Sequence, residues 1–208
     1  MEGCVISNNV ISYYHDRNSA GAYIVSGVMD RCIIVDNVKQ VVPGVSVRGG
    51  TLRNSLVMRN RDDRAGKMGQ GVYLQSGVVE SCTVVDNTGD AGGVGILVEG
   101  GTVSNCVAYY NGDGTADIDQ TGGTVVFTAS SNSVAGTGNI TDAPLFEDRP
   151  AGDYSLIIDS PCRDTGAENI SWMTETLDLA GNDRVAGSTV DMGAYESLGL
   201  VGTILVIR

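Results

Sequence analysis

The stretch Cys82-Thr83-Val84-Val85-Asp86-Asn87 decides the fold, because the chain repeats its pattern several times. Each clear copy begins with Cys or Ser, has an apolar residue two positions later, and ends with Asn five positions after its start. Successive copies start 28, 23, 27, 24 and 25 residues apart. A period of about 25 residues predicts a repeat architecture. The clear copies start at Cys4, Cys32, Ser55, Cys82 and Cys106, and we expect a worn sixth copy from Ser131.

Two further blocks recur between these copies. One is a glycine followed by alternating apolar residues, as in Gly71-Val72-Tyr73-Leu74, and the other places an apolar residue three positions before the Cys. Alternation with period 2 predicts strands with one face inward. Three short strands per repeat predict an all-β, right-handed parallel β-helix (solenoid) of about five to six coils, with the handedness resting on the resemblance described below. We expect the coils over residues 1–140 and an irregular C-terminal covering segment over residues 141–208.

Stacking the coils places equivalent residues in columns. An Asn side chain can hydrogen-bond to the same residue of the next coil, and Asn tolerates a left-handed backbone. The Asn column is therefore predicted to be a structural asparagine ladder, formed by Asn9, Asn37, Asn60, Asn87 and Asn111. The Cys and Ser residues should point inward, where a free Cys behaves as a small hydrophobe, in preference to disulfides or a metal site. The state of Cys162, outside this column, stays open.

The first strand is apolar on its outward face as well. Its outward residues include Ile33, Leu56, Val85 and Val107. A strand that is apolar on both faces is normally buried on both. We expect part of residues 143–208, around Leu145-Phe146, Trp172 and the tail 198–207, to cover this row. The alternative is a homodimer in which a second copy of the chain covers it.

The repeats and several C-terminal motifs carry a family resemblance. Residues 3–140 resemble the right-handed parallel β-helix repeats of the pectate-lyase-like superfamily. The segment 139–196 resembles the C-terminal region called choice-of-anchor type Q. The resemblance implies right-handed coils and a secreted or cell-surface bacterial protein. The chain departs from it after Glu196, where it ends in an apolar tail too short to span a bilayer. The C-terminal motifs are Ala143-Pro144-Leu145-Phe146, Ala151-Gly152-Asp153-Tyr154, Ser160-Pro161-Cys162-Arg163-Asp164-Thr165-Gly166, Asp178-Leu179-Ala180-Gly181-Asn182 and Val190-Asp191-Met192-Gly193-Ala194-Tyr195-Glu196.

The charge is unevenly distributed along the chain. The formal net charge is −12, but residues 1–67 carry nine Lys and Arg against six Asp and Glu, whereas residues 68–208 carry four against nineteen. The acidic excess disfavours nucleic acid as a partner of the whole molecule. An anionic ligand at the first three coils stays open. No apolar stretch is long enough to predict a membrane span.

The candidate site lies on the two longest connections after the Asn column, residues 10–21 and 61–71. Long loops on one edge of a regular scaffold are where function concentrates. Coils stack about 4.8 Å apart, so these loops should lie about 10 Å from each other. Tyr23 and Tyr73 should point outward on the adjoining strand, on either side of Ser46. The candidate catalytic residues are His15, Asp62, Asp63 and Arg64, and the candidate substrate-binding residues are Tyr14, Tyr23, Arg61, Lys67 and Tyr73.

Two classes of function compete for this edge. The favoured one is a non-enzymatic module that engages carbohydrate, or protein, along it. The alternative is a carbohydrate-active enzyme. Paired acids with a His could hydrolyse a glycosidic bond. The resemblance instead implies a lyase with an Arg or Lys base and Ca²⁺. Against the hydrolase, the Ser-His-Gly and Arg-Ile-Lys motifs that accompany paired acids in polygalacturonases are missing. The stretch Arg61-Asp62-Asp63-Arg64 is also consistent with a self-neutralising, solvated loop.

No cofactor is expected. The spacing of Asp113, Asp117 and Asp119 could bind Ca²⁺, but a turn followed by a polar strand is favoured, because the 12-residue loop with a terminal Glu is missing.

Overall fold

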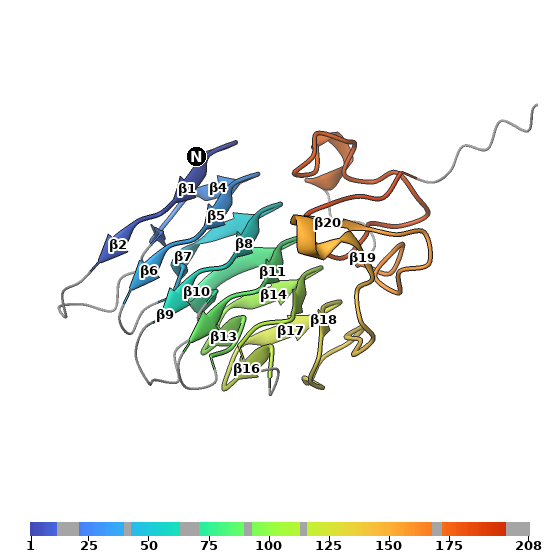
Figure 1. Cartoon of the computed structure of the whole chain (residues 1–208). Helices are drawn as coiled ribbons and strands as arrows, with labels where there is room; N and C mark the ends of the chain where they lie inside the picture. The colour runs from blue at the N-terminus through green and yellow to red at the C-terminus, as the bar shows by residue number, and fades with distance from the viewer. Residues whose placement is uncertain are drawn as a thin grey trace, which may run out of the picture.

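The computed structural model describes residues 1–11, 21–39, 43–62, 71–89, 93–112, 116–167 and 172–198. The chain is an all-β solenoid in which short strands stack in parallel (Figure 1). Four coils contribute strands to all three parallel sheets within the described ranges, fewer than the five to six coils expected. A fifth turn supplies β15(Val107–Tyr109), β16(Ile118–Gln120) and β17(Thr124–Val126), and β18(Ala129–Ser130) follows it.

The three sheets follow the three recurring blocks of the sequence. The repeated Cys-to-Asn frame supplies, in sheet order, β1(Val5–Ser7), β5(Ile33–Val35), β8(Leu56–Met58), β11(Thr83–Val85), β15 and β18. After each of the first four Asn comes a two-residue strand, giving β2(Val10–Ile11), β6(Val38–Lys39), β9(Arg61–Asp62) and β12(Thr88–Gly89). The third sheet holds β3(Ala22–Ile24), β4(Val28–Asp30), β7(Val45–Arg53), β10(Val72–Glu80), β13(Ile96–Val98), β14(Thr102–Ser104), β16 and β17.

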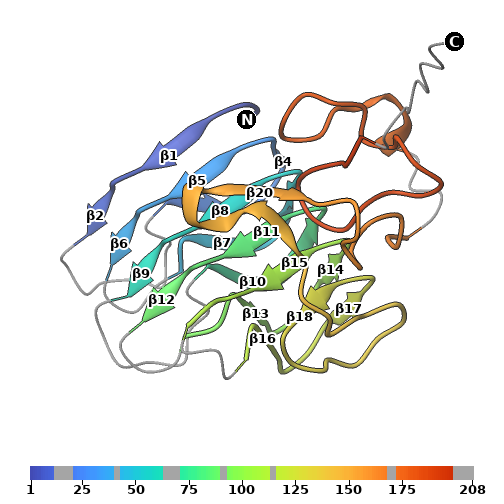
Figure 2. The ribbon, with the colours of Figure 1, turned by 45° about the vertical axis from the view of Figure 1, so that its right-hand side comes forward.

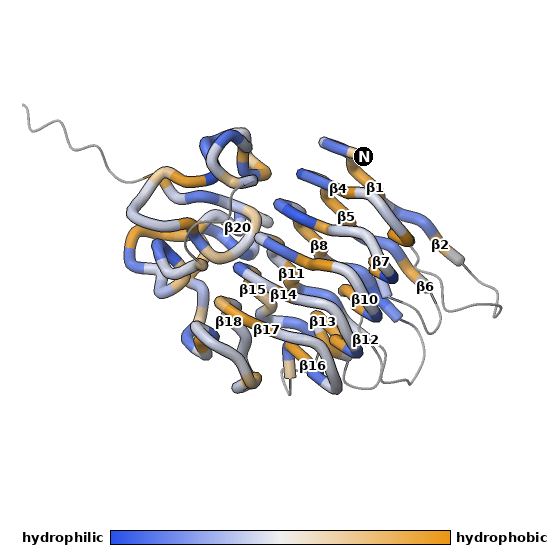
Figure 3. The backbone as a smooth tube through the Cα atoms, turned by 180° about the vertical axis from the view of Figure 1, so that it is seen from behind, coloured by the Kyte–Doolittle hydropathy of each residue, from blue (hydrophilic) through white to orange (hydrophobic). Residues whose placement is uncertain are grey.

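The parallel register aligns equivalent residues without a shift in the first sheet. Ile6 pairs with Ile34, Ile34 with Val57, Val57 with Val84, and Val84 with Ala108. These side chains and their counterparts from the third sheet form one apolar core inside the coils. Figure 3 shows apolar positions recurring along the stacked strands. The inward row read from the period-2 alternation is therefore confirmed.

The Asn column forms a ladder that runs in one direction. The Oδ1 of Asn87 accepts the backbone N–H of Asn60 at 3.0 Å and its Nδ2 at 2.9 Å. The Nδ2 of Asn87 donates to the Val57 carbonyl and to Asn111 Oδ1, both at 2.9 Å. The same pattern joins Asn9 to Asn37 and Asn37 to Asn60. Each amide thus satisfies backbone groups that the turn would otherwise leave buried and unpaired.

The left-handed residue at each of these corners is the one before the Asn, not the Asn itself. Asp36, Arg59, Asp86 and Tyr110 have φ between 51° and 62°. A non-glycine residue rarely adopts this conformation, so the turn carries a conformational cost in every coil. The ladder Asn residues are therefore explained by their side-chain amides and not by tolerance of a left-handed backbone.

The Cys and Ser column is also a hydrogen-bonding column. Each member donates from its Sγ or Oγ to the carbonyl two residues earlier: Cys82 to Glu80 at 3.2 Å, and Ser55 to Arg53 at 2.6 Å. The same side chain also accepts a hydrogen bond from the preceding coil: the N–H of Cys32 donates to Ser55 Oγ at 3.1 Å. Burial raises the pKa of the Cys82 thiol, which keeps it in the S–H form that donates. All five Cys are free, as expected for a column without disulfides.

The sixth copy begins at Thr128 and not at Ser131. β18 pairs with β15 so that Ala129 lies beside Val107, and Thr128 Oγ1 accepts the N–H of Cys106 at 3.4 Å. The sequence pattern predicts the start three residues too late, because Thr128 stands where the other copies have Cys or Ser. Thr offers the same hydroxyl group as Ser. The shift shows that this column selects a small donor side chain and not Cys or Ser alone.

The C-terminal segment covers the outward face of the first sheet, as Figure 2 shows for β19(Phe146–Asp148) and β20(Asp153–Leu156). These two strands are antiparallel and flank the 3-10 turn η1(Arg149–Ala151); a second such turn is η2(Met173–Glu175). Tyr154 packs with Leu56 and Val85, and Leu156, Cys162 and Met192 pack with Val107. The expected covering of Leu56, Val85 and Val107 is confirmed.

Two details of that covering differ from the expectation, and a third is described only at its first residue. Phe146 packs against the sheet, but Leu145 is exposed. Trp172 contacts the neighbouring corner instead. The Arg53 guanidinium lies 4.4 Å from the ring centroid of Trp172, and the Nε1 of Trp172 donates to Glu80 at 3.1 Å. The tail was expected over residues 198–207; Leu198 is exposed, and the remainder lies outside the described residues.

The ladder predicts unequal costs for two identical substitutions. Asn87→Ala leaves the Asn60 N–H and the Val57 carbonyl buried without partners, so we expect it to lower the free energy of unfolding by about 3 kcal/mol or more. Asn9→Ala, at the exposed end, should cost about 1 kcal/mol or less. Urea unfolding measures both, and equal losses would contradict the ladder as the source of stability.

The thiol column makes a second prediction. Cys82→Ser keeps a donor at the position that Ser55 occupies one coil away, whereas Cys82→Ala leaves the Glu80 carbonyl without this bond. We expect the Ala variant to be destabilised by about 1 kcal/mol more than the Ser variant in urea unfolding. If Ser costs more than Ala, the column acts only through apolar packing.

Candidate functional site

Five of the nine predicted site residues lie outside the described residues: Tyr14, His15, Asp63, Arg64 and Lys67. The proposed meeting of His15 with the two acids therefore stays a prediction. The structure describes Tyr23, Arg61, Asp62 and Tyr73, and these four divide between two sheets.

Arg61 and Asp62 form β9, where their side chains point to opposite faces. Arg61 is exposed, while Asp62 has no exposed surface. Alternation along a strand explains this difference. In this conformation the Asp62 carboxyl is turned away from solvent, so it is not presented to a polymer lying along the edge. The prediction that Asp62 acts on such a substrate is therefore not supported by its placement.

Tyr23 and Tyr73 occupy the outward row of the third sheet, with Ser46 between them in register. Tyr23 is 43% exposed, but Tyr73 has no exposed surface. Tyr73 therefore does not offer the outward ring face that we expected for stacking on a sugar. Its hydroxyl donates to Glu99 Oε2 instead.

Arg48 links the two tyrosines. Its guanidinium carbon lies 5.5 Å from the ring centroid of Tyr23 and 5.7 Å from that of Tyr73, within the range of a cation–π contact. Sequence reasoning missed Arg48, although its position two residues after Ser46 placed it on the same outward face. The result is a half-exposed Tyr23 beside the guanidinium of a partly exposed Arg48. Such a pair can stack on one sugar face and contact an anionic substituent.

Asp117, one of three Asp residues whose spacing could bind Ca²⁺, has a structural role. Its Oδ1 accepts the backbone N–H of Asn111 at 2.7 Å and the Nδ2 of Asn111 at 2.9 Å, and its Oδ2 accepts the N–H of Ser131 at 3.3 Å. A carboxylate only accepts hydrogen bonds, so Asp117 ends the asparagine ladder in place of another amide. Asp113 lies outside the described residues.

A second aromatic and charged cluster holds the C-terminal segment at the Asn corner. Arg149 lies 4.0 Å from the Tyr110 ring centroid and donates from Nε to Asp86 at 3.0 Å. The Tyr154 hydroxyl donates to the other oxygen of Asp86 at 2.7 Å. Burial raises the pKa of Tyr154, and the Asp86 carboxylate adds to the rise. Asp86, in the left-handed corner position, thus anchors the covering segment.

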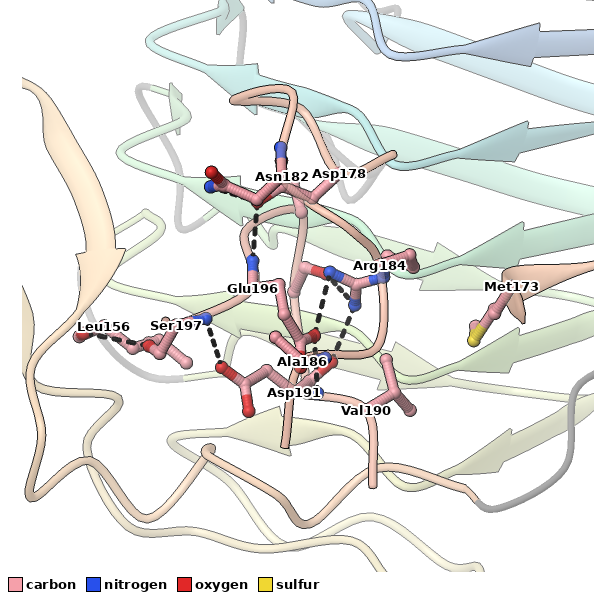
Figure 4. A network of polar contacts seen from close by, with 12 residues as sticks. Leu156, Met173, Asp178, Asn182, Arg184, Ala186, Val190, Asp191, Glu196 and Ser197 are labelled. Atoms are coloured by element: carbon pink, nitrogen blue, oxygen red, sulfur yellow. Dashed lines mark hydrogen bonds and ion pairs between the residues drawn. The ribbon is translucent and has the colours of Figure 1, made fainter. Parts of the chain in front are cut away.

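The closing motif of the chain forms a buried polar network (Figure 4). Arg184 has no exposed surface; its Nη2 donates to the carbonyls of Asp191 at 2.7 Å and Gly193 at 2.8 Å, and its Nη1 lies 3.6 Å from Glu196. Glu196 accepts the N–H groups of Ala186 and Asp191 at 3.1 and 3.0 Å. Buried acids here satisfy backbone N–H groups that have no sheet partner.

Two further acids act in the same way. Asp178 accepts the N–H groups of Asn182 and Glu196, at 2.7 and 2.8 Å. Asp191 accepts those of Asp164 and Ser197, both at 2.7 Å. The acids of the Asp178-to-Asn182 motif and of the closing Val190-to-Glu196 motif are thus explained by the folding of an irregular segment, and not by chemistry on a substrate.

The described parts of the chain offer no cluster of three or more His, Cys, Asp or Glu side chains that could hold a metal ion. None of their helical turns is long and apolar enough to cross a membrane. Comparisons of the chain with protein-family models, with curated proteins and with solved structures found no match.

The network predicts a pH dependence of stability. Burial raises the pKa of Glu196 to about 7 from its ordinary value of 4.5. Above pH 4.5 the unfolded state favours the ionised carboxyl more than the folded state does, so this group lowers stability at neutral pH. The penalty disappears as the pH falls through 7 toward 4.5. We expect Glu196 to make the fold about 2 kcal/mol more stable at pH 5 than at pH 7.5.

Glu196→Gln is the matched variant, because it removes the titration and keeps one acceptor oxygen. Urea unfolding of both proteins at the two pH values isolates the contribution of Glu196. An unchanged pH dependence in the Gln variant would show that other groups, such as Asp191, whose pKa is also raised by burial, are responsible.

Proposed function

We propose that this chain is an extracellular or cell-surface bacterial β-solenoid module that engages carbohydrate along the edge bearing its long connections. The observation that carries the proposal is the half-exposed Tyr23 ring beside the Arg48 guanidinium, on the outward face of stacked strands. An aromatic face next to an Arg suits a sugar ring that carries a carboxylate. Arg61, exposed in β9, adds a second cation on the neighbouring sheet.

The sequence resemblance supports the same proposal. Right-handed parallel β-helix repeats of the pectate-lyase-like kind, followed by a choice-of-anchor type Q region, are expected in secreted or surface-attached bacterial proteins. Repetition of the scaffold at about 4.8 Å per coil gives a linear polymer several equivalent contact positions in one row. Binding accounts for the described residues better than catalysis, because the Asp62 carboxyl is buried. No cofactor is part of this proposal.

The proposal predicts selective binding of acidic oligosaccharides. We expect uronate oligomers to bind more tightly than neutral oligomers of the same length, and Tyr23→Ala to weaken binding by about tenfold, because losing one aromatic stacking contact costs roughly 1 kcal/mol or slightly more. Arg48→Gln should reduce the preference for uronates more than it reduces binding of neutral sugars. Isothermal titration calorimetry with both ligand sets measures these changes.

A second aromatic–cation pair provides the matched control. Tyr110→Ala and Arg149→Gln remove a similar pair on a different sheet and should leave sugar binding unchanged. Loss of binding only in this control pair would move the site to the covering segment. Failure of the unmodified protein to bind any acidic or neutral oligosaccharide would reject the carbohydrate function.

A further inference from the structure

The coils have a second corner, where the third sheet ends and the strand of the first sheet follows. Its left-handed residues, with φ between 46° and 51°, stand directly before the Cys and Ser column: Arg31, Asn54, Ser81 and Asn105. The N–H of Ser81 donates to the Ser104 carbonyl at 3.0 Å, and that of Asn54 makes the equivalent bond one coil earlier at 3.2 Å. Equivalent residues of the second corner are therefore stacked about 4.8 Å apart, as they are in the Asn column.

The C-terminal segment encloses the second corner. The N–H groups of Ala167 and Gly193 donate to the side-chain oxygen and to the carbonyl of Asn105, at 2.6 and 2.8 Å. Asn54, Ser81 and Asn105 have no exposed surface. Polar groups in such a place need partners inside the protein, because bulk water does not reach them.

Two amides of the second corner are arranged like members of the Asn ladder. Asn54 Nδ2 donates to Asp30 Oδ1 at 3.1 Å, and Asn105 Oδ1 accepts the N–H of Ala167 at 2.6 Å. These partners fix both amide orientations, since a carboxylate only accepts hydrogen bonds and a backbone N–H only donates them. Each amide keeps one further group to be satisfied, which is the oxygen of Asn54 and the nitrogen of Asn105. One more amide on the coil between them would satisfy both groups.

Ser81 occupies that intermediate coil and interrupts the series. Within the described residues, Asn54 Oδ1, Ser81 Oγ and Asn105 Nδ2 are buried and have no hydrogen-bond partner. In the Asn ladder, by contrast, a carboxamide on every coil spans the spacing with bonds of 2.9 Å. Leaving three buried polar atoms unmatched on successive coils would have a high desolvation cost. The three atoms are an acceptor, a hydroxyl that can donate and accept, and a donor, and water can join such a set.

We propose that the second corner holds an interrupted amide ladder, in which Ser81 Oγ and enclosed water together replace the missing carboxamide. The nitrogen of Asn105 donates into this link and the oxygen of Asn54 accepts from it, so the hydrogen bonds run in the direction that an amide would give them. Asn exceeds Ser in size by roughly the volume of one water molecule, 30 Å³. The link makes the series continuous from Asp30 to the N–H of Ala167, and it thereby joins successive coils to the covering segment. The inference is independent of the carbohydrate proposal, since neither requires the other.

Ser81→Asn tests the interruption by completing the ladder. Its amide can donate to Asn54 Oδ1 and accept from Asn105 Nδ2, so direct bonds replace links through water and the immobilised water is released. We expect the equilibrium constant for unfolding at a fixed urea concentration to fall by about tenfold. An Asn variant that is no more stable than the unmodified chain overturns the proposal.

Ser81→Asp is the matched control. Asp has the size of Asn and also tolerates a left-handed backbone, but its carboxylate cannot donate to Asn54 Oδ1. We expect the Asp variant to unfold at lower urea concentration than the unmodified chain. If the Asp variant is as stable as the Asn variant, side-chain size or backbone preference explains the gain, and the ladder is rejected.

A high-resolution crystal structure of the unmodified chain tests the water directly, whatever the variants do. We expect ordered water within hydrogen-bonding distance of Ser81 Oγ and of the amide atoms of Asn54 and Asn105 that lack partners. In the Ser81→Asn variant, the new carboxamide should stand where this water was. A direct bond from Ser81 to either amide, or the lack of ordered water between them, contradicts the proposal.

Discussion

The side-chain amide ladder is the interaction on which the rest of this structure depends. Every coil turns a corner at a left-handed residue such as Asp86, and the Asn that follows supplies the hydrogen bonds that this turn removes from the backbone. Because each amide both accepts from one coil and donates to the next, the ladder also sets the register between coils. Correct register then aligns Ile34, Val57 and Val84 in one buried row. The alignment of the core side chains therefore depends on the hydrogen bonds at the corners as well as on apolar burial.

The same principle explains the end of the stack and the covering segment. Asp117 ends the ladder because a carboxylate has no N–H group and so needs no further acceptor, and buried acids such as Glu196 and Asp178 satisfy backbone N–H groups in a segment with few strands. Burying Arg184 and Glu196 together has a desolvation cost that their hydrogen bonds must offset. The raised pKa of Glu196 is the visible part of that cost. Acid-rich motifs here therefore hold an irregular fold together.

The proposed binding surface follows from what the scaffold leaves exposed. Regular stacking places Tyr23, Ser46 and Tyr73 in one outward row, yet only Tyr23 keeps a half-exposed ring. Arg48 joins the two tyrosines, so the cation and the aromatic face come from neighbouring coils. A repeated scaffold offers positions of this kind in every coil, and single side chains decide which of them remains open to a ligand.

Five features could be predicted from the sequence alone: the solenoid, the inward row, the Asn ladder, the free Cys column and the need for a covering segment. Each of these rests on a local period that recurs along the chain, and identical local environments fold alike. The sequence did not predict the start of the last copy at Thr128, the burial of Tyr73 and Asp62, or the anchoring of Tyr154 by Asp86. These features depend on contacts between residues far apart in sequence, where no period links the partners. Each repeat packs against neighbours with the same sequence pattern, so its contacts can be predicted from that pattern. The position of an irregular segment is set by its packing against residues that no pattern identifies.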